Sequence, residues 1–146
     1  MKRREFITGS AAETEILGEE FSQNLRRGDV LLLYGELGTG KTTFTRGICR
    51  AFGVNFVKSP SFVIVNVYDG GFPIFHIDLY RLEEIEPDTA GEIMEYLWNE
   101  DGISIVEWAD RLPDEIVPAK AIKIYFERIS DNERKITIEA WYEKWQ

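Results

Sequence analysis

Short, almost wholly apolar runs along this chain are separated by segments whose apolar residues recur at helical spacing. The runs DVLLLYG (29–35) and GISIVEW (102–108) predict buried strands, because an unbroken apolar run of this length is typical of a parallel strand covered on both faces. Residues 41–52, which end before Gly53, and residues 89–100 predict helices. Strands that alternate with helices indicate an α/β fold.

A further helix is predicted near the N-terminus. The string SAAE (10–13) forms a capping box, in which the Ser10 hydroxyl accepts from the backbone N–H of Glu13 and the Glu13 side chain reaches back. Apolar residues then recur at helical spacing over residues 17–25, and Gly28 is the predicted stop.

Two pairs of alternating segments predict antiparallel hairpins. FVIVNVY (62–68) and PIFHIDLY (73–80) flank the turn DGGF, and AIKIYFERI (121–129) and KITIEAWY (135–142) flank SDNER. The chain shows no linker and no internal repeat, so we expect one domain over residues 1–146, with a mixed sheet to which hairpins are added.

Charge and cysteine content narrow the function classes. The net charge is −9, with 26 acidic and 17 basic residues and no basic stripe, so we expect no direct binding to DNA or tRNA, and a basic protein partner suits the charge better. No apolar run reaches the ~20 residues of a membrane span, and no apolar segment follows Arg4 as in an export signal. The single cysteine, Cys49, is expected in the core, and these features together predict a cytoplasmic protein.

The string GELGTGKT (35–42) matches the phosphate-loop pattern G-x-x-x-x-G-K-[ST] in full. Its glycines let backbone N–H groups approach phosphate closely, and the helix that follows adds the positive end of its dipole. Lys41 is expected to bridge the β- and γ-phosphates, and the Thr42 hydroxyl to bind Mg²⁺. An apolar strand leads into the pattern and a helix leaves it, so the predicted fold class is a three-layer α/β P-loop NTPase sandwich.

Two acids end apolar strands and are candidates to hold Mg²⁺ beside the phosphates. Asp78 ends PIFHID (73–78) and Glu107 ends ISIVE (103–107), and these residues alone do not rank one above the other. His76, the only histidine, either supports the acid on its own strand or is simply a packed residue. Arg81 either contacts phosphate or lies on the surface, and Trp108 belongs to the core or to a docking surface.

The string DTAG (88–91) occurs in GTPase switches, where its aspartate ends a buried strand. Here the acidic LEEIE and Pro87 precede it, so Pro87 and Asp88 instead predict a helix start, with Asp88 or Thr89 as the cap. A guanine-reading N-K-x-D is absent from the sequence. The nucleotide is therefore not expected to be GTP.

Four strings together resemble the bacterial TsaE family, also called YjeE, over nearly the whole chain. They are GELGTGKTTF (35–44), KSPSF (58–62), HIDLYR (76–81) and ISIVEWADR (103–111). The resemblance implies that Gly38, Thr39, Gly40, Lys41, Thr42 and Thr43 bind ATP, that Thr42 and Glu107 are the Mg²⁺ ligands, and that Lys41, Asp78 and Glu107 are catalytic.

The same resemblance implies a switch-like role near the γ-phosphate for SPSF (59–62), in which Ser61 stands where the family more often has threonine. It also implies an ATP hydrolase, slow in isolation, that supports threonylcarbamoyl modification of tRNA adenosine. TsaD-type transferase and TsaB-type scaffold proteins are the implied partners, and tRNA is contacted only indirectly. A small-molecule kinase and an ATP-dependent regulatory binding protein are the alternatives.

Overall fold

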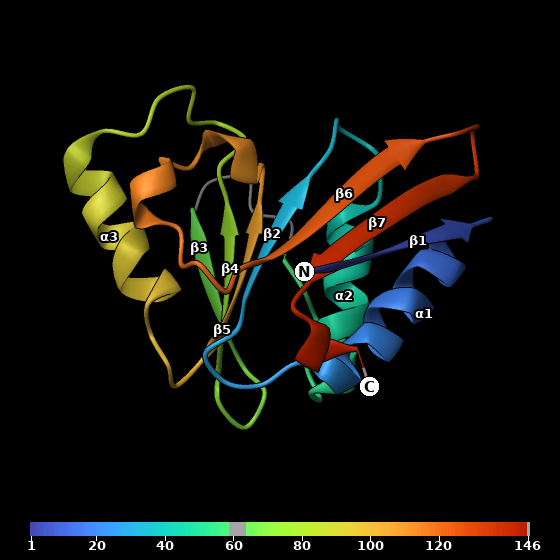
Figure 1. Ribbon diagram of the computed structural model, residues 1–146, viewed down its shortest axis with the longest axis horizontal. Coiled ribbons are helices and arrows are strands. Elements are labelled where there is room, and N and C mark those ends of the chain that lie inside the picture. Colours follow the sequence, from blue (N-terminus) through green and yellow to red (C-terminus); the bar gives the residue numbers. More distant parts are fainter. Residues whose placement is uncertain (59–63, 146) are drawn as a thin grey trace.

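The computed structural model describes residues 1–58 and 64–145, which form seven strands, three α-helices and four short 3₁₀ turns (Figure 1). The strands are β1 (Lys2–Thr8), β2 (Val30–Tyr34), β3 (Val65–Asp69), β4 (Pro73–Asp78), β5 (Ile103–Glu107), β6 (Ile122–Arg128) and β7 (Arg134–Ala140). The helices are α1 (Ala11–Phe21), α2 (Lys41–Ala51) and α3 (Pro87–Leu97). The 3₁₀ turns are η1 (Ser22–Asn24), η2 (Ala109–Arg111), η3 (Asp114–Ile116) and η4 (Tyr142–Lys144).

All seven strands belong to one mixed sheet, in the order β1-β7-β6-β2-β5-β4-β3. The four central strands β6, β2, β5 and β4 are parallel to one another, whereas the pairs β1–β7, β6–β7 and β3–β4 are antiparallel. The predicted α/β class with a mixed sheet and two added hairpins is therefore confirmed. Because parallel strands end at the same edge, the residues that follow β2, β4 and β5 come together there.

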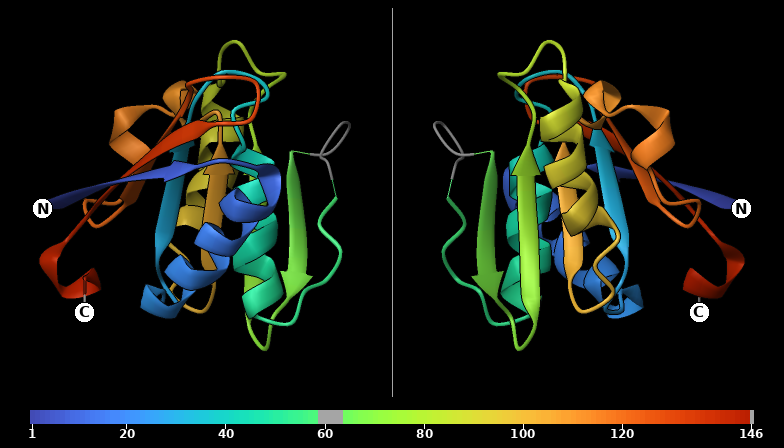
Figure 2. Two further views of the ribbon diagram at one scale, coloured as in Figure 1. Left: turned by 90° about the vertical axis from the view of Figure 1, so that its right-hand side faces the viewer. Right: turned by 90° about the vertical axis from the view of Figure 1, so that its left-hand side faces the viewer.

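Helices cover both faces of the sheet, as Figure 2 shows from two sides. Alternate residues of β2 enter different cores: Leu31 and Leu33 pack with α1 and α2, whereas Val30 and Leu32 pack with α3. This two-sided burial explains why β2 has an unbroken apolar sequence. Within the described residues, no helix has the length and apolar character needed to cross a membrane.

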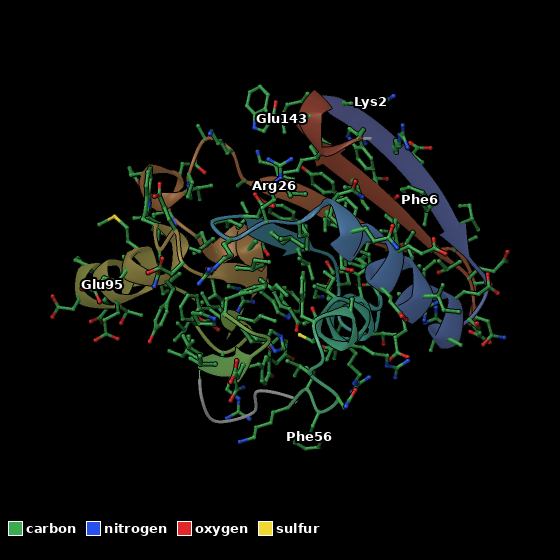
Figure 3. The ribbon with its side chains drawn as sticks, turned by 90° about the horizontal axis from the view of Figure 1, so that it is seen from below. Lys2, Phe6, Arg26, Phe56, Glu95 and Glu143 are labelled. Atoms are coloured by element: carbon green, nitrogen blue, oxygen red, sulfur yellow. The ribbon has the colours of Figure 1, made fainter. Side chains whose placement is uncertain are left out.

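Strand β1 was not predicted from the sequence. It pairs with β7 from Lys2 opposite Ala140 to Thr8 opposite Arg134, and it lies at the outer edge of the sheet, where Figure 3 labels Lys2 and Phe6. Its first four residues are exposed and charged, so no apolar alternation marks them as a strand. Its place depends on the pairing with β7, which is distant in sequence.

Two predicted helix starts differ from the structure in their details. The Ser10 hydroxyl accepts from the Glu13 N–H at 3.1 Å as predicted, but Glu13 accepts from the Gly9 N–H at 3.1 Å instead of from Ser10. Helix α3 does begin at Pro87, yet Glu86 is its N-cap residue, so the prediction of Asp88 or Thr89 as the cap was wrong. Proline is favoured in the first turn because its missing N–H has no partner there anyway.

Candidate functional site

The phosphate-loop pattern forms the connection between β2 and α2. Gly40 is the N-cap residue of α2 and has φ of 103°, a left-handed conformation that glycine adopts without strain. A Cβ atom on Gly35 would lie 2.8 Å from the Phe126 carbonyl oxygen, so the loop also requires glycine for close packing against β6. The Thr39 hydroxyl donates to the Glu36 carbonyl at 2.7 Å and braces the loop from within.

Lys41 is folded back onto its own loop. Only 5% of the residue is exposed, and its Nζ donates to the carbonyl oxygens of Gly35 at 2.5 Å and Glu36 at 2.9 Å. The ammonium also lies 4.3 Å from the centre of the Trp108 ring. Burial lowers the pKa of Lys41, while the nearby carboxylates of Glu107 and Asp78 oppose that shift. The cation is thus held by weak acceptors, which a phosphate anion can replace.

Thr42 and Glu107 meet directly. The Thr42 hydroxyl donates to Glu107 Oε1 at 2.8 Å, although the two residues are 65 positions apart in the sequence. Strand register produces the contact, because Glu107 ends β5 opposite Leu33 of β2 on one side and Asp78 of β4 on the other. Glu107 is only 3% exposed. The edge of the sheet therefore brings both candidate acids beside the loop.

Asp78 occupies a different setting from Glu107. Its Oδ1 accepts from the backbone N–H of Tyr80 at 2.9 Å, and its side chain lines the same cavity as Lys41 and Thr42. Burial raises the pKa of Asp78, and the charge of Glu107 raises it further, whereas the hydrogen bond from Tyr80 lowers it. In this structure the carboxylate hydrogen-bonded to the loop hydroxyl is that of Glu107.

A cavity of about 500 Å³ extends over the loop, a size that suits a nucleotide. Four groups of residues line it: the loop residues Leu37 to Thr43; Ser10, Ala11 and Thr14 at the start of α1; Asp131, Asn132 and Arg134 at the β6–β7 turn and the start of β7; and Asp78, Tyr80, Arg81, Glu107 and Trp108 at the ends of β4 and β5. Sequence reasoning named residues 38–43 but missed Arg134, whose guanidinium donates to the Gly38 carbonyl at 3.1 Å. No sequence signal marks Arg134, since strand pairing alone brings it there.

The remaining sequence candidates take definite places. His76 is fully buried and contacts Glu107, on the neighbouring strand, with 2.5 Å between Nε2 and Oε2. Trp108 has φ of 60°, and among the described residues it is the only one other than glycine with a positive φ. Its ring packs on that of Tyr80. Cys49 is fully buried, as predicted, and burial raises its pKa to about 12. The SPSF segment (59–62), with Ser61, lies outside the described residues.

The oxygen donors at the loop fit magnesium bound together with a nucleotide. Residues 1–58 and 64–145 contain no cluster of three or more histidine, cysteine or acidic side chains able to hold a metal by themselves. Thr42, Glu107 and Asp78 instead offer a hydroxyl and two carboxylates beside an open, glycine-lined loop. Mg²⁺ typically takes one or two carboxylates, several waters and substrate phosphates, so a sparse oxygen set is the expected one.

Comparisons with known proteins agree with one another. The sequence model of the family described as "Threonylcarbamoyl adenosine biosynthesis protein TsaE" matches residues 8–136. The tRNA threonylcarbamoyladenosine biosynthesis protein TsaE of Bacillus subtilis is 38% identical over 142 residues, which cover 96% of this chain and 87% of that protein. The protein of the same name from Aquifex aeolicus is 36% identical, with 92% and 95% of the two chains covered.

A solved structure is similar as well. The crystal structure of YdiB from Bacillus subtilis superposes with a TM-score of 0.78 at 33% sequence identity, over 95% of this chain and 86% of that one. The likeness in sequence and the likeness in fold therefore extend over almost the whole chain.

Proposed function

The chain belongs to the TsaE family, and we propose that it is a Mg²⁺-dependent P-loop ATPase that supports the making of threonylcarbamoyladenosine in tRNA. The observation that carries the proposal is the 2.8 Å hydrogen bond between Thr42, directly after the loop lysine, and Glu107 at the end of β5. A loop lysine, a loop hydroxyl and a strand-end carboxylate are the parts that phosphoryl-transfer sites of this class use.

In this proposal each residue of the site has one task. The backbone N–H groups of residues 38–43 and the positive end of α2 bind the phosphates. Lys41 leaves the carbonyl oxygens of Gly35 and Glu36 for the β- and γ-phosphates, which are stronger acceptors. Thr42 and Glu107 hold Mg²⁺, which when bound neutralises charge that develops on the phosphates. Asp78, at the same sheet edge, serves hydrolysis or switching.

Hydrolysis is expected to be slow in the isolated protein. The cavity carries Arg81 and Arg134, but Arg134 already donates to the Gly38 carbonyl and to three carbonyls of its own turn. We therefore assign full turnover to the protein in complex with a TsaD-type transferase and a TsaB-type scaffold, either of which can contribute a cationic group in trans. The net charge of −9 suits contacts with basic protein surfaces and makes tRNA an indirect partner.

The metal assignment is tested with Glu107→Ala. Phosphate release from ATP is measured with Mg²⁺ and with EDTA, and the variant is expected to lose the Mg²⁺-dependent part of the rate. Ser104→Ala, on the same strand and also buried, removes a hydrogen bond to the Tyr96 carbonyl away from the site and serves as the control. Mg²⁺-dependent hydrolysis that persists in Glu107→Ala would show that the metal is held by other groups.

Reaction products and partners test the rest of the proposal. With a panel of metabolites the wild-type protein is expected to release only ADP and phosphate, whereas a phosphorylated metabolite would identify a small-molecule kinase.

A pull-down from the native cell extract, with and without ATP, is expected to recover a tRNA-modifying transferase. Recovery of a partner that depends on ATP binding, without any hydrolysis, would favour a regulatory binding protein.

A further inference from the structure

A chain of hydrogen bonds runs from the phosphate loop into the interior of the protein, across three neighbouring strands. Glu107 ends β5, His76 lies on β4, and Tyr68 lies on the edge strand β3. Thr42 Oγ1 is 2.8 Å from Glu107 Oε1, Glu107 Oε2 is 2.5 Å from His76 Nε2, and His76 Nδ1 is 3.1 Å from the Tyr68 hydroxyl. The Tyr68 oxygen in turn accepts from the backbone N–H of Lys58 at 3.1 Å.

One assignment of the protons gives every donor in this chain of hydrogen bonds an acceptor. The Lys58 N–H can only donate, so it uses a lone pair of the Tyr68 oxygen, and in this assignment the hydroxyl proton is donated to His76 Nδ1. Burial raises the pKa of Tyr68 to about 12, so this proton is present at neutral pH. An imidazole that accepts at Nδ1 carries its proton on Nε2, from which it donates to the Glu107 carboxylate.

The three side chains of this hydrogen-bond chain are buried, so each depends on its protein partners. His76 is 0% exposed, Glu107 3% and Tyr68 9%, so water cannot readily replace any of these partners. In a site of low polarity a satisfied hydrogen bond is strong, and an unpaired carboxylate oxygen is costly. Among the described residues, no buried side-chain nitrogen or oxygen lacks a hydrogen-bond partner. Glu107 therefore has one oxygen fixed by the interior and one directed at Thr42.

We propose that His76 is a positioning residue of the phosphate site, which holds one oxygen of Glu107 through its Nε2–H while Tyr68 fixes its tautomer. This inference rests on the proposed function for its consequence, namely that Glu107 offers a single oxygen, Oε1, beside Thr42 for Mg²⁺. The carboxylate is then ordered before the nucleotide arrives, as partners behind a metal ligand usually ensure. His76 itself touches neither ATP nor the metal.

The tautomer is tested by nitrogen-15 NMR of the histidine side chain in the nucleotide-free protein. His76 is the only histidine, so its imidazole signals need no assignment by mutation. We expect the ring to carry a proton on Nε2 and to accept a hydrogen bond at Nδ1. Tyr68→Phe is expected to populate the other tautomer, because Nδ1 then loses its donor. A wild-type ring protonated at Nδ1, or a Tyr68→Phe spectrum unchanged from the wild type, would overturn the inference.

The consequence for the metal is tested with paired variants of His76. The Mg²⁺ concentration that half-saturates tight ATP binding is expected to rise roughly 10- to 100-fold in His76→Leu, while ATP affinity in EDTA stays unchanged. His76→Gln retains an N–H donor and is expected to recover part of the loss, and Ser104→Ala is the buried control. A wild-type Mg²⁺ dependence in His76→Leu would overturn the positioning role.

The two measurements separate this inference from the proposed function. The NMR result is obtained without nucleotide, so it stands even if the protein proves unable to hydrolyse ATP. If His76→Leu does not fold, the spectra of the wild type and of Tyr68→Phe still decide the inference.

Discussion

The ionised side chain of Asp78 is partly buried, which lowers the stability of the folded protein. Burial raises its pKa above the ordinary value, so the folded state binds a proton more readily than the unfolded chain does. The stability that comes from this carboxyl group is complete below its unfolded pKa of about 3.9 and is lost as the pH rises through the folded pKa. At neutral pH without metal the ionised side chain therefore destabilises the protein.

Asp78→Asn is accordingly expected to melt at a higher temperature than the wild type at pH 7 in EDTA, because the amide keeps the bond from the Tyr80 N–H without the buried charge. The difference should shrink as the pH falls toward the unfolded pKa of about 3.9, because the wild-type carboxyl then takes up a proton. Thermal melts at the two pH values measure it, and ATP hydrolysis should fall in the same variant. A variant less stable than the wild type at both pH values would contradict this account.

For single residues, the sequence predicted the phosphate-binding residues that are adjacent in the chain, but not the hydrogen-bond partners that are far apart in it. Lys41 and Thr42 are adjacent, so their pattern alone indicated the phosphate site. His76 was expected either to support the acid two positions away on its own strand or simply to pack in the core, yet it contacts Glu107, 31 positions along the chain. Alternation within a strand shows which residues share a face, but only the pairing of β4 with β5 determines which neighbour they reach.

At the scale of elements, α1 and α2 pack so closely that glycine is required where they meet. A Cβ atom on Gly47 of α2 would lie 1.9 Å from the Glu15 carbonyl oxygen, and one on Gly18 of α1 would lie 2.2 Å from the Phe44 carbonyl oxygen. These are contacts with helix backbone, which cannot rotate away. Since α2 begins at the phosphate loop, this packing also sets the position of Lys41.

Gly47→Ala is therefore expected to destabilise the protein by roughly 1–3 kcal/mol or more, as overpacking does. Gly91→Ala is the matched control, because Gly91 lies inside α3 with no atom within 4 Å of the added Cβ. That control should gain about 0.5–1 kcal/mol from the better helix propensity of alanine. Urea unfolding of both variants measures the two changes. Equal effects of the two substitutions would show that the helices do not need the glycine contact.

The same scale shows which elements could be predicted. The strongly apolar β2 and β5 and the three helices were found because burial on one face or two leaves a period in the sequence. Strand β1 escaped prediction because it is an edge strand whose side chains are mostly exposed. Its position is fixed by pairing with β7 and by Trp145, which donates to the Lys2 carbonyl at 3.2 Å, and such long-range contacts have no local pattern.

At the scale of the whole molecule, the sheet collects the site at one edge. Parallel strands β2, β4 and β5 end beside one another, and the start of α1 and the β6–β7 turn complete the cavity. The sequence predicted the first part, because parallel strands of this kind carry ligands at their carboxyl ends. No local pattern marks the second part, since Ser10 and Arg134 reach the cavity through the antiparallel pairing at the far side of the sheet.

The most direct test of the central claim is calorimetric titration of ATP into the protein with Mg²⁺. We expect one site per chain, and Lys41→Ala should weaken binding at least about 10-fold, or about 1.4 kcal/mol, because the loop then lacks the cation that meets the β- and γ-phosphates. Lys120→Ala, exposed and outside the lining of the cavity, is the matched control and should bind as the wild type does. Absence of ATP binding by the wild type, or equal affinity in a folded Lys41→Ala variant, would contradict the account.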